Sequence, residues 1–495
     1  MRPGGLLGLH PPRTDRGRLL LLLTLAAAVI VFTATVPLLR DWFDLRVYHG
    51  TVDSWIHEGG RIYDYRVPGT PYGFTYPPFA AVVMLPMALV GLRTAIVTAL
   101  LLDLAALTFV VRVCVGPRWR RYGWYGAGLA ACALAVFEPL RDTFSFGQVN
   151  LLLLALVLAD AGLLASGRTR WAGVGIGLAA AVKLTPALFI GLLLVARRWR
   201  AAALATAVAA AATALAALVA PDASRFYWTR ALWDTSRVGR LDYVSNQSLQ
   251  GVLARLGVET RAVWAVLVLA VLGWWAWRAR RAVAAGDWRA AFALTGLTSC
   301  LVSPVTWVHH LVWLLPSFAV LIHAGRPRVA GALYAVLCTS VVWLWFDDAS
   351  GVGGFLGGNT YTWITLGLLI SLPVGYPPAE RRPTNPRTNA TAAPPSTAAP
   401  AMNAASGQPG RSATATVTGT VVPVGAAAVE AGPEEGKEEE VEAEAEAAVE
   451  TGAGSGPAPG TGRGRGRARS ASSEPTGSTR PAAANPQSSS ERASS

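Results

Sequence analysis

Residues 19–39 read Leu-Leu-Leu-Leu-Leu-Thr-Leu-Ala-Ala-Ala-Val-Ile-Val-Phe-Thr-Ala-Thr-Val-Pro-Leu-Leu, without a single charged side chain. An α-helix needs about 20 mostly apolar residues to cross the hydrocarbon core of a bilayer. Arg13, Arg16 and Arg18 precede the run, as in a signal peptide, but the run is long and lacks a small-residue cleavage site. The stretch therefore predicts a retained membrane anchor.

Similar apolar segments follow one another as far as residue 375. Together they predict an all-α polytopic membrane protein with about 10–12 transmembrane helices. The number of transmembrane helices depends on whether residues 171–195 form one span or a helical hairpin that is broken near Lys183. The other candidate segments are 93–115, 123–139, 148–165, 201–220, 261–277, 290–302, 310–322, 329–346 and 361–375.

The composition of the 495-residue chain agrees with this class. Hydrophobic residues make up 52% and charged residues only 15%, whereas soluble globular chains average about 25% charged residues. An ordinary soluble enzyme is therefore not expected. The four cysteines stand singly in apolar segments without metal-ligand or redox spacing, which predicts small core residues.

The basic charge follows a membrane-topology pattern. The net charge of +13 comes from 43 Lys+Arg against 30 Asp+Glu, and arginines of the apolar body cluster in alternate loops. This alternation places both termini in the cytoplasm if Lys183 marks a turn toward the outer side and residues 77–92 are re-entrant or interfacial. Topology accounts for the charge, so nucleic-acid binding is not needed. The arginine-bearing loops are 118–121, 168–170, 197–200, 278–281 and 326–328.

The chain changes character after residue 376. Residues 377–495 are rich in Pro, Ala, Ser, Thr and Gly, with an acidic block at 434–450 and an Arg-Gly run at 463–469. An Arg-Gly run can bind RNA, but a solvated disordered tail is the simpler interpretation, because such a composition cannot bury a core. We therefore expect a cytoplasmic N-terminal segment (1–18), a polytopic membrane domain (19–376) and a disordered cytoplasmic tail (377–495).

The first outer loop places acids among aromatic residues. Asp-Leu-Arg-Val-Tyr runs from Asp44 to Tyr48, and Phe-Thr-Tyr-Pro-Pro at 74–78 contains Tyr76. Asp44 follows the first apolar run closely, so it is expected near the outer membrane face. A partly desolvated carboxylate there is suited to act as a general base. The alternative is a solvated acid that pairs with Arg46.

Lys183 is the only lysine of the apolar body and stands in Val-Lys-Leu-Thr-Pro at 182–186. An ionisable group within a span costs at least about 2.5–3.5 kcal/mol, so it usually faces a cavity and a partner. Pro186 is expected to break the helix beside it. A cation at this boundary is suited to hold a lipid phosphate, and snorkelling to the interface is the alternative.

Two amide-bearing motifs lie near the ends of apolar segments. Gly-Gln-Val-Asn at 147–150 carries Gln148 and Asn150, which either cap a helix or contact a ligand. Asn246 and Gln247 form a second polar group, which is a weak signal by itself.

A third motif, Ser-Pro-Val-Thr-Trp-Val-His-His, occupies 303–310 and includes Trp307, His309 and His310. Adjacent histidines cannot share one helix face, and no third ligand stands at metal spacing in this segment. Phosphate binding, proton transfer or aromatic contact with a sugar therefore fits better than a metal site. Two interfacial histidines at a helix start are the alternative.

Together these motifs resemble glycosyltransferase family 87, whose motif order they follow over residues 19–375. The family is an actinobacterial group of polytopic enzymes with the membrane glycosyltransferase (GT-C) fold, and it includes alpha-mannosyltransferases that use polyprenyl-phosphate mannose. The resemblance implies a GT-C-type fold whose outer loops carry short helices. The matching stretches are 44–48, 74–78, 147–150, 183–186, 246–249 and 303–310.

The resemblance also implies an inverting transfer of mannose to an extracytoplasmic glycolipid or glycan acceptor, with an alpha linkage in the product. Asp44 would accept the proton of the acceptor hydroxyl. No cofactor or metal is expected, because the leaving group is a single phosphate. The expected donor-phosphate ligands are Lys183, His309, His310 and Arg46, and the expected sugar and lipid contacts are Tyr48, Tyr76, Trp307, Gln148, Asn150, Asn246 and Gln247.

Two other functions remain open from the residues. The family also contains arabinofuranosyltransferases that use polyprenyl-phosphate arabinose, and a secondary transporter or lipid flippase would also use broken helices and a buried lysine. Against a transporter, the two halves show no internal repeat. The expected partners are a polyprenyl-phosphate sugar donor, a glycolipid or glycan acceptor and membrane lipids. The expected location is the cell membrane, with the active site on the extracytoplasmic side.

Overall fold

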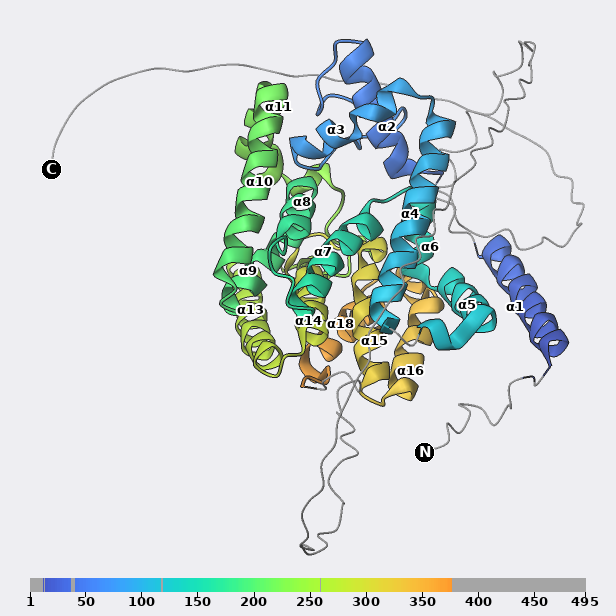
Figure 1. The fold of residues 1–495 in the computed structure, drawn as a ribbon. Coiled ribbons are helices and arrows are strands. Elements are labelled where there is room, and N and C mark those ends of the chain that lie inside the picture. The colour runs from blue at the N-terminus through green and yellow to red at the C-terminus, as the bar shows by residue number, and fades with distance from the viewer. Residues whose placement is uncertain (1–11, 13, 37–40, 117–118, 259, 376–495) are drawn as a thin grey trace, which may run out of the picture. The chain divides into compact units, whose positions relative to one another are not determined.

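A computed structural model describes residues 12, 14–36, 41–116, 119–258 and 260–375, and within these ranges every regular element is helical (Figure 1). One isolated antiparallel bridge joins Arg66 and Gly73. The expected all-α fold is thus confirmed. The predicted tail, 377–495, and most of the predicted N-terminal segment, 1–18, lie outside the described residues.

Among the described residues, four helices are long and apolar enough to cross a membrane. Large apolar side chains on them are exposed, including Leu101 at 63%, Leu218 at 83% and Leu269 at 68%. Apolar surface of this extent suits contact with lipid chains. The polytopic membrane architecture is therefore confirmed. The four helices are α1 (Asp15–Thr35), α4 (Leu92–Val115), α10 (Trp199–Val219) and α13 (Arg261–Ala284).

Further apolar helices are shorter or bent. α6 (Glu138–Phe146) and α7 (Asn150–Ala165) form a fifth candidate span with a bend of 116°. The count of 10–12 crossings includes shorter helices as spans and stays a prediction. The shorter elements are α5 (Trp119–Val136), α8 (Val174–Val182), η3 (Thr185–Ala187), α9 (Leu188–Val195), α14 (Trp288–Val302), η6 (Val308–Leu314), α15 (Leu315–His323), α16 (Pro327–Cys338) and α18 (Thr360–Ser371).

The predicted helix break beside Lys183 is present, and one predicted segment is interrupted. α8 ends at Val182, Lys183 is extended, and Pro186 lies in the following 3₁₀ turn. Residues 77–92 form only a short helical piece, α3 (Pro78–Met84) and η1 (Leu85–Leu89). The predicted segment 329–346 is interrupted because Ser340 adopts a positive φ of 56° between α16 and η7 (Val341–Trp345).

α14 forms the centre of the main core. Thirteen of its 15 residues are buried, and it contacts α7, α9, α13, α15, α18 and η6. Many of these buried residues are small (Ala, Gly, Ser, Thr and Cys), which lets neighbouring helices approach closely. Because α14 ends at Val302, the 303–310 motif that follows it lies in the interior of the helix bundle.

A second, aromatic core joins the short helices between the longer ones. α2 (Phe43–His57) buries Leu45, Tyr48 and Val52, which lie on one helical face at spacings of three and four. Figure 1 shows α2 and α3 together at one end of the helical bundle. Short helices in the outer loops were expected from the resemblance. The remaining short helices of the described residues are α11 (Pro221–Thr229), η4 (Ala231–Trp233), η5 (Thr235–Arg237), α12 (Leu249–Arg255) and α17 (Gly351–Gly357).

Candidate active site

Side chains from distant parts of the sequence meet in one hydrogen-bonded network. Gln148 Nε2 donates to Asp44 Oδ2 at 2.6 Å, and Tyr76 OH donates to Gln148 Oε1 at 2.9 Å. Tyr48 OH donates in turn to Tyr76 OH at 2.9 Å. The chain of donors thus points toward the carboxylate of Asp44. We name as the Asp44 network the seven residues Asp44, Tyr48, Tyr76, Gln148, Asn150, Lys183 and His310.

The other end of the Asp44 network is the amine of Lys183. Lys183 Nζ lies 3.2 Å from Tyr76 OH, 3.0 Å from Asn150 Oδ1 and 2.7 Å from His310 Nε2. It also lies 4.8 Å from the centroid of the Tyr76 ring. Tyr76 therefore contacts the lysine directly and the aspartate through Gln148. One continuous set of bonds connects the proposed base to the proposed phosphate ligands.

Gly147 ends α6 and lies close against α2 at this point. It has a positive φ of 68°, which glycine adopts without strain. A Cβ atom at this position would lie 2.7 Å from Cβ of Leu45. The close approach places Gln148 beside Asp44, and the same α2 helix carries Tyr48 one turn further on. The Gly-Gln-Val-Asn motif therefore builds the network through its backbone as well as its amides.

Asp44 has the character of a titratable base. Its side chain is half-buried, and burial raises its pKa from 3.8 to about 6. The hydrogen bond from Gln148 opposes that rise, and so does Lys183 whenever its amine is protonated. Burial also raises the pKa of Tyr48 and Tyr76, so both phenols remain protonated donors near neutral pH. A carboxylate with a pKa near the working pH suits general base catalysis.

The two histidines occupy different positions. The backbone N–H of Trp307 donates to His310 Nδ1 at 2.9 Å, which directs His310 Nε2 toward Lys183. The His309 ring is 3% exposed and packs edge-on against His310 and Phe146, with ring centroids 4.6 and 5.1 Å apart. Its backbone carbonyl accepts bonds from Thr143 and Asn150. His310 thus faces Lys183, and His309 supports it from behind.

Arg46 and Trp307 lie beside the Asp44 network. Arg46 is exposed on α2 and forms an ion pair with Asp41 at 2.5 Å. Trp307 packs edge-on against Tyr243 with ring centroids 5.9 Å apart, and it lies close to Gly239. Neither side chain joins the bonds of the Asp44 network. Their proposed contacts with donor phosphate and sugar stay predictions.

Asn246 is bonded to the 303–310 motif, and its sugar contact stays a prediction. Its side chain is fully buried and donates to the carbonyls of Leu241 and Pro304 while accepting from the backbone N–H of Thr306. Both amide hydrogens and the amide oxygen are therefore used within the protein. Asn246 connects its own loop to the 303–310 motif, so its role in the structure is to position that motif.

The side chain of Gln247 also bonds to backbone groups of the protein. It is fully buried, its Nε2 donates to the carbonyls of Val244 and Gly358, and its Oε1 accepts from the backbone N–H of Thr362. Sugar contact through this amide would require breaking those bonds. The sequence could not separate these uses, because Asn and Gln serve backbone groups and sugars equally well.

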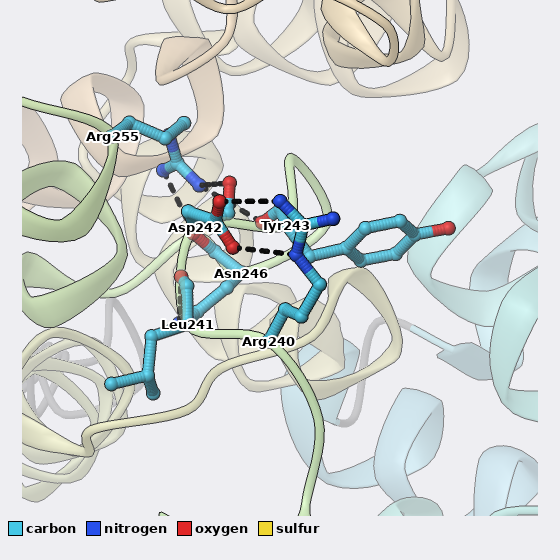
Figure 2. Close-up of polar contacts among 6 residues, drawn as sticks. All are labelled: Arg240, Leu241, Asp242, Tyr243, Asn246 and Arg255. Carbon is cyan, nitrogen blue, oxygen red and sulfur yellow. Dashed lines mark hydrogen bonds and ion pairs between the residues drawn. The ribbon is translucent and has the colours of Figure 1, made fainter. Parts of the chain in front are cut away.

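Arg255 holds the loop that carries Asn246 (Figure 2). Its guanidinium donates to the carbonyls of Tyr243 and Asn246, both at 2.9 Å. In the same loop, Arg240 forms a two-point contact with Asp242 at 3.1 and 2.7 Å. These bonds fix the loop behind the 303–310 motif.

Two further residues near the site were not identified from the sequence. Thr143 donates to the His309 carbonyl at 3.1 Å, and its own carbonyl accepts from the Gln148 N–H at 2.9 Å. Asp103 is 3% exposed in the middle of α4, and its charge contributes to the raised pKa of Tyr48. An acid within an apolar segment is a functional signal, so Asp103 was detectable, whereas nothing in the sequence marks Thr143.

The fold and the Asp44 network define an all-helical polytopic membrane protein with a polar site where helices break and meet. Comparison with known proteins specifies the class further. The model of glycosyltransferase family 87 matches residues 74–304. No solved structure matches the chain significantly.

Curated relatives extend the match beyond that region. A Mycobacterium tuberculosis (strain CDC 1551 / Oshkosh) protein is 35% identical over 337 residues, which cover 65% of this chain and 76% of the relative. It is named a polyprenol-phosphate-mannose-dependent alpha-(1-2)-phosphatidylinositol pentamannoside mannosyltransferase. A Mycolicibacterium smegmatis relative is 33% identical over 404 residues, covering 73% of this chain and 90% of the relative. Its name specifies a phosphatidylinositol mannoside mannosyltransferase with the same donor and linkage.

This chain belongs to glycosyltransferase family 87. The resemblance seen in the six sequence motifs is thereby confirmed. The protein is a membrane glycosyltransferase. A secondary transporter or flippase is disfavoured, because the relatives are named as sugar-transfer enzymes.

Proposed function

We propose that this protein is an alpha-mannosyltransferase that uses polyprenyl-phosphate mannose and acts on a glycolipid acceptor. The printed names of the relatives support this donor and a phosphatidylinositol mannoside as the acceptor class. The observation that carries the proposal is the Asp44 network, in which a half-buried carboxylate and a lysine amine terminate one set of hydrogen bonds. Such a transfer needs a base for the acceptor and a cationic site for the leaving phosphate.

In the proposed reaction, a hydroxyl oxygen of the acceptor attacks C1 of mannose from the face opposite the phosphate. The new C1–O bond forms as the bond between C1 and the phosphate oxygen breaks, and polyprenyl phosphate leaves. Asp44 accepts the hydroxyl proton through the part of its carboxylate that Gln148 does not hold. A beta-linked donor therefore gives an alpha-linked product by inversion.

The phosphate ligands are proposed at the opposite end of the Asp44 network. Lys183 and the Nε2–H of His310 lie together and are suited to stabilise the negative charge that develops on the leaving oxygen. His309 holds His310 in place from behind. We propose that no metal is required, because one phosphate leaves and a lysine with a histidine can balance its charge.

We further propose that the site opens to the extracytoplasmic side and that both termini are cytoplasmic. The arginine distribution among alternate loops supports this orientation. Single-cysteine variants at residues 168 and 234, labelled from one side of intact cells, test it. Residue 168 is expected to be protected and residue 234 to be labelled. The reverse pattern contradicts the proposed orientation.

The function is tested with the full-length protein in detergent or nanodiscs, radiolabelled polyprenyl-phosphate mannose and a phosphatidylinositol mannoside acceptor. We expect an alpha-linked mannosylated product that alpha-mannosidase removes. Transfer from polyprenyl-phosphate arabinose, with none from the mannose donor, would establish the arabinofuranosyltransferase alternative. Movement of the lipid between leaflets without any sugar transfer would contradict both.

A further inference from the structure

The amine of Lys183 makes three polar contacts, and their directions constrain its protonation state. Tyr76 OH and Asn150 Oδ1 lie 3.2 and 3.0 Å from Nζ. Tyr76 OH donates its own hydrogen to Gln148, and the Asn150 oxygen carries no hydrogen. Lys183 is therefore the donor in both contacts. The third contact, at 2.7 Å, is with His310 Nε2.

The backbone determines the tautomer of His310. The N–H of Trp307 points at His310 Nδ1 at 2.9 Å, so Nδ1 accepts and carries no hydrogen. A charged imidazolium has hydrogens on both nitrogens and is excluded by this bond. A neutral imidazole without hydrogen on Nδ1 carries it on Nε2. His310 Nε2–H therefore donates toward Lys183.

An ammonium group cannot accept a hydrogen bond, because all its hydrogens are donors and it has no lone pair. A neutral amine has two N–H donors and one lone pair, which matches the two donated bonds and the one accepted bond at Lys183. We propose that Lys183 is a neutral amine when the site is empty, and that binding of the donor's anionic phosphate converts it to an ammonium by uptake of one proton. This inference rests on the proposed function for the identity of the phosphate ligand.

The surroundings of Lys183 favour a neutral amine as long as no anion is bound. The groups that face it are Tyr76, His310 and Cys300, with Asp44 acting from the far side of Gln148. Tyr48 and His309 lie one contact further out. A buried ammonium without a directly bonded anion carries a large desolvation penalty. A neutral pair of Lys183 and His310 avoids that cost until an anion arrives.

Binding of the donor phosphate favours the ammonium form of Lys183 over the neutral amine. The lone pair of Lys183 takes a proton from water, and the resulting N–H bonds to a phosphate oxygen as a charge-assisted bond. His310 Nε2–H, released from the amine, donates to a second phosphate oxygen while the Trp307 N–H still holds Nδ1. When polyprenyl phosphate leaves, the amine gives up the proton and returns to its three-bond state. Donor affinity is thereby linked to pH, with up to tenfold loss per pH unit above the amine's titration point.

The first test needs no donor, because the chain contains only two lysines, Lys183 and Lys437. The full-length protein is treated with acetic anhydride across a pH series, and acetylation of each lysine is followed by peptide mass spectrometry. Only neutral amines react. Reactivity of Lys183 is expected to reach half its plateau at least two pH units below the about 10.4 of an ordinary lysine, with Lys437 as internal reference. Reaction that appears only in the range of an ordinary lysine overturns the proposal.

The second test measures protons taken up with the donor. Binding of polyprenyl-phosphate mannose is measured by calorimetry near pH 8 in buffers of different ionisation enthalpy. The donor is a phosphodiester without a group that titrates there, and the Asp44→Asn background removes the nearby carboxylate. We expect uptake approaching one proton per donor with Lys183 present, and none in Lys183→Arg, whose guanidinium stays charged.

The two tests separate the possible failures. Donor binding without proton uptake overturns the neutral amine and leaves the proposed function standing. A protein that does not bind or use the mannose donor contradicts the proposed function, while acetylation still decides the state of Lys183. Equal proton uptake by Lys183→Arg would assign the proton to another group and overturn the proposal.

Discussion

Two carboxylates, Asp44 and Glu138, are enclosed by this fold in contrasting ways. Glu138 is fully buried, and its two oxygens accept from Trp343 Nε1, at 2.6 Å, and from Tyr361 OH. Asp44 is half-buried, and its hydrogen bond among the described residues comes from Gln148. Glu138 has a protein donor on each oxygen, whereas Asp44 keeps part of its carboxylate for a ligand.

Burial alone therefore does not identify a reactive acid. A carboxylate with both oxygens bonded is a structural connector, here joining α6 to η7 and α18. Asp44 instead has one donor, and the rest of its carboxylate stays available to a ligand. It can therefore still accept a proton, as a general base must. The same chemical change, carboxylate to amide, can therefore be made at both sites as a matched pair.

Catalysis is expected to fall most in the Asp44→Asn variant. An amide cannot accept the acceptor's proton, so kcat is expected to fall by about a hundred- to ten-thousand-fold. The protein should melt no lower than wild type, because ionising Asp44 against its raised pKa costs folding free energy above pH 6. Initial rates and thermal unfolding in the same detergent measure both quantities. Wild-type turnover in this variant would remove Asp44 as the base.

The matched change, Glu138→Gln, is expected to affect stability instead. Glutamine offers one acceptor oxygen where Trp343 and Tyr361 both donate, so one buried donor loses its partner. The free energy of unfolding is expected to fall by about 1–3 kcal/mol. Turnover per folded molecule should stay within about twofold, since α6 is held by other contacts. A large loss of turnover with an unchanged melting temperature would show that Glu138 takes part in catalysis. It would contradict the distinction between Glu138 as a structural residue and Asp44 as the base.

Gln148→Leu tests whether the donor on Asp44 positions the base. Loss of a hydrogen bond to a charged group costs about 1.5–3 kcal/mol, or roughly ten- to a hundredfold in kcat. The wild-type rate is expected to fall about tenfold per pH unit below a midpoint near 6, because the base must be ionised. Since Gln148 lowers the pKa of Asp44, the leucine variant should move that midpoint to higher pH. A lower rate with an unmoved midpoint would indicate a purely structural role.

The features of this site that depend on local chemistry could be predicted from the sequence. The break at Lys183 could be predicted because Pro186 cannot continue a helix, and Lys183 itself stood out as a charge in an apolar segment. Asp44 and Tyr48 are four residues apart, so one helical face carries both once α2 is recognised as a helix. Most helix positions followed from apolar length alone.

The remaining features depend on contacts between distant segments. The bond between Gln148 and Asp44 joins residues 104 positions apart, so the motif showed an amide without showing its partner. Asn246 looked equally suitable for a sugar, yet it serves the backbone of the 303–310 motif. The sequence around Glu138 does not show its donors, because they come from residues 343 and 361.

Tyr48→Phe is expected to reduce kcat only slightly. Its hydroxyl donates to Tyr76 and lies one step outside the direct path from Lys183 to Asp44, and the ring would still pack against Tyr76, 5.5 Å away. Tyr76 keeps its bond to Gln148 and its contact with Lys183, so a loss of about 0.5–1 kcal/mol, or two- to fivefold in kcat, is expected. Tyr76→Phe is the matched control, because it removes the hydroxyl that contacts both Lys183 and Gln148 and should cost more. Equal losses in kcat for the two variants would show that the base and the amine do not communicate through Tyr76.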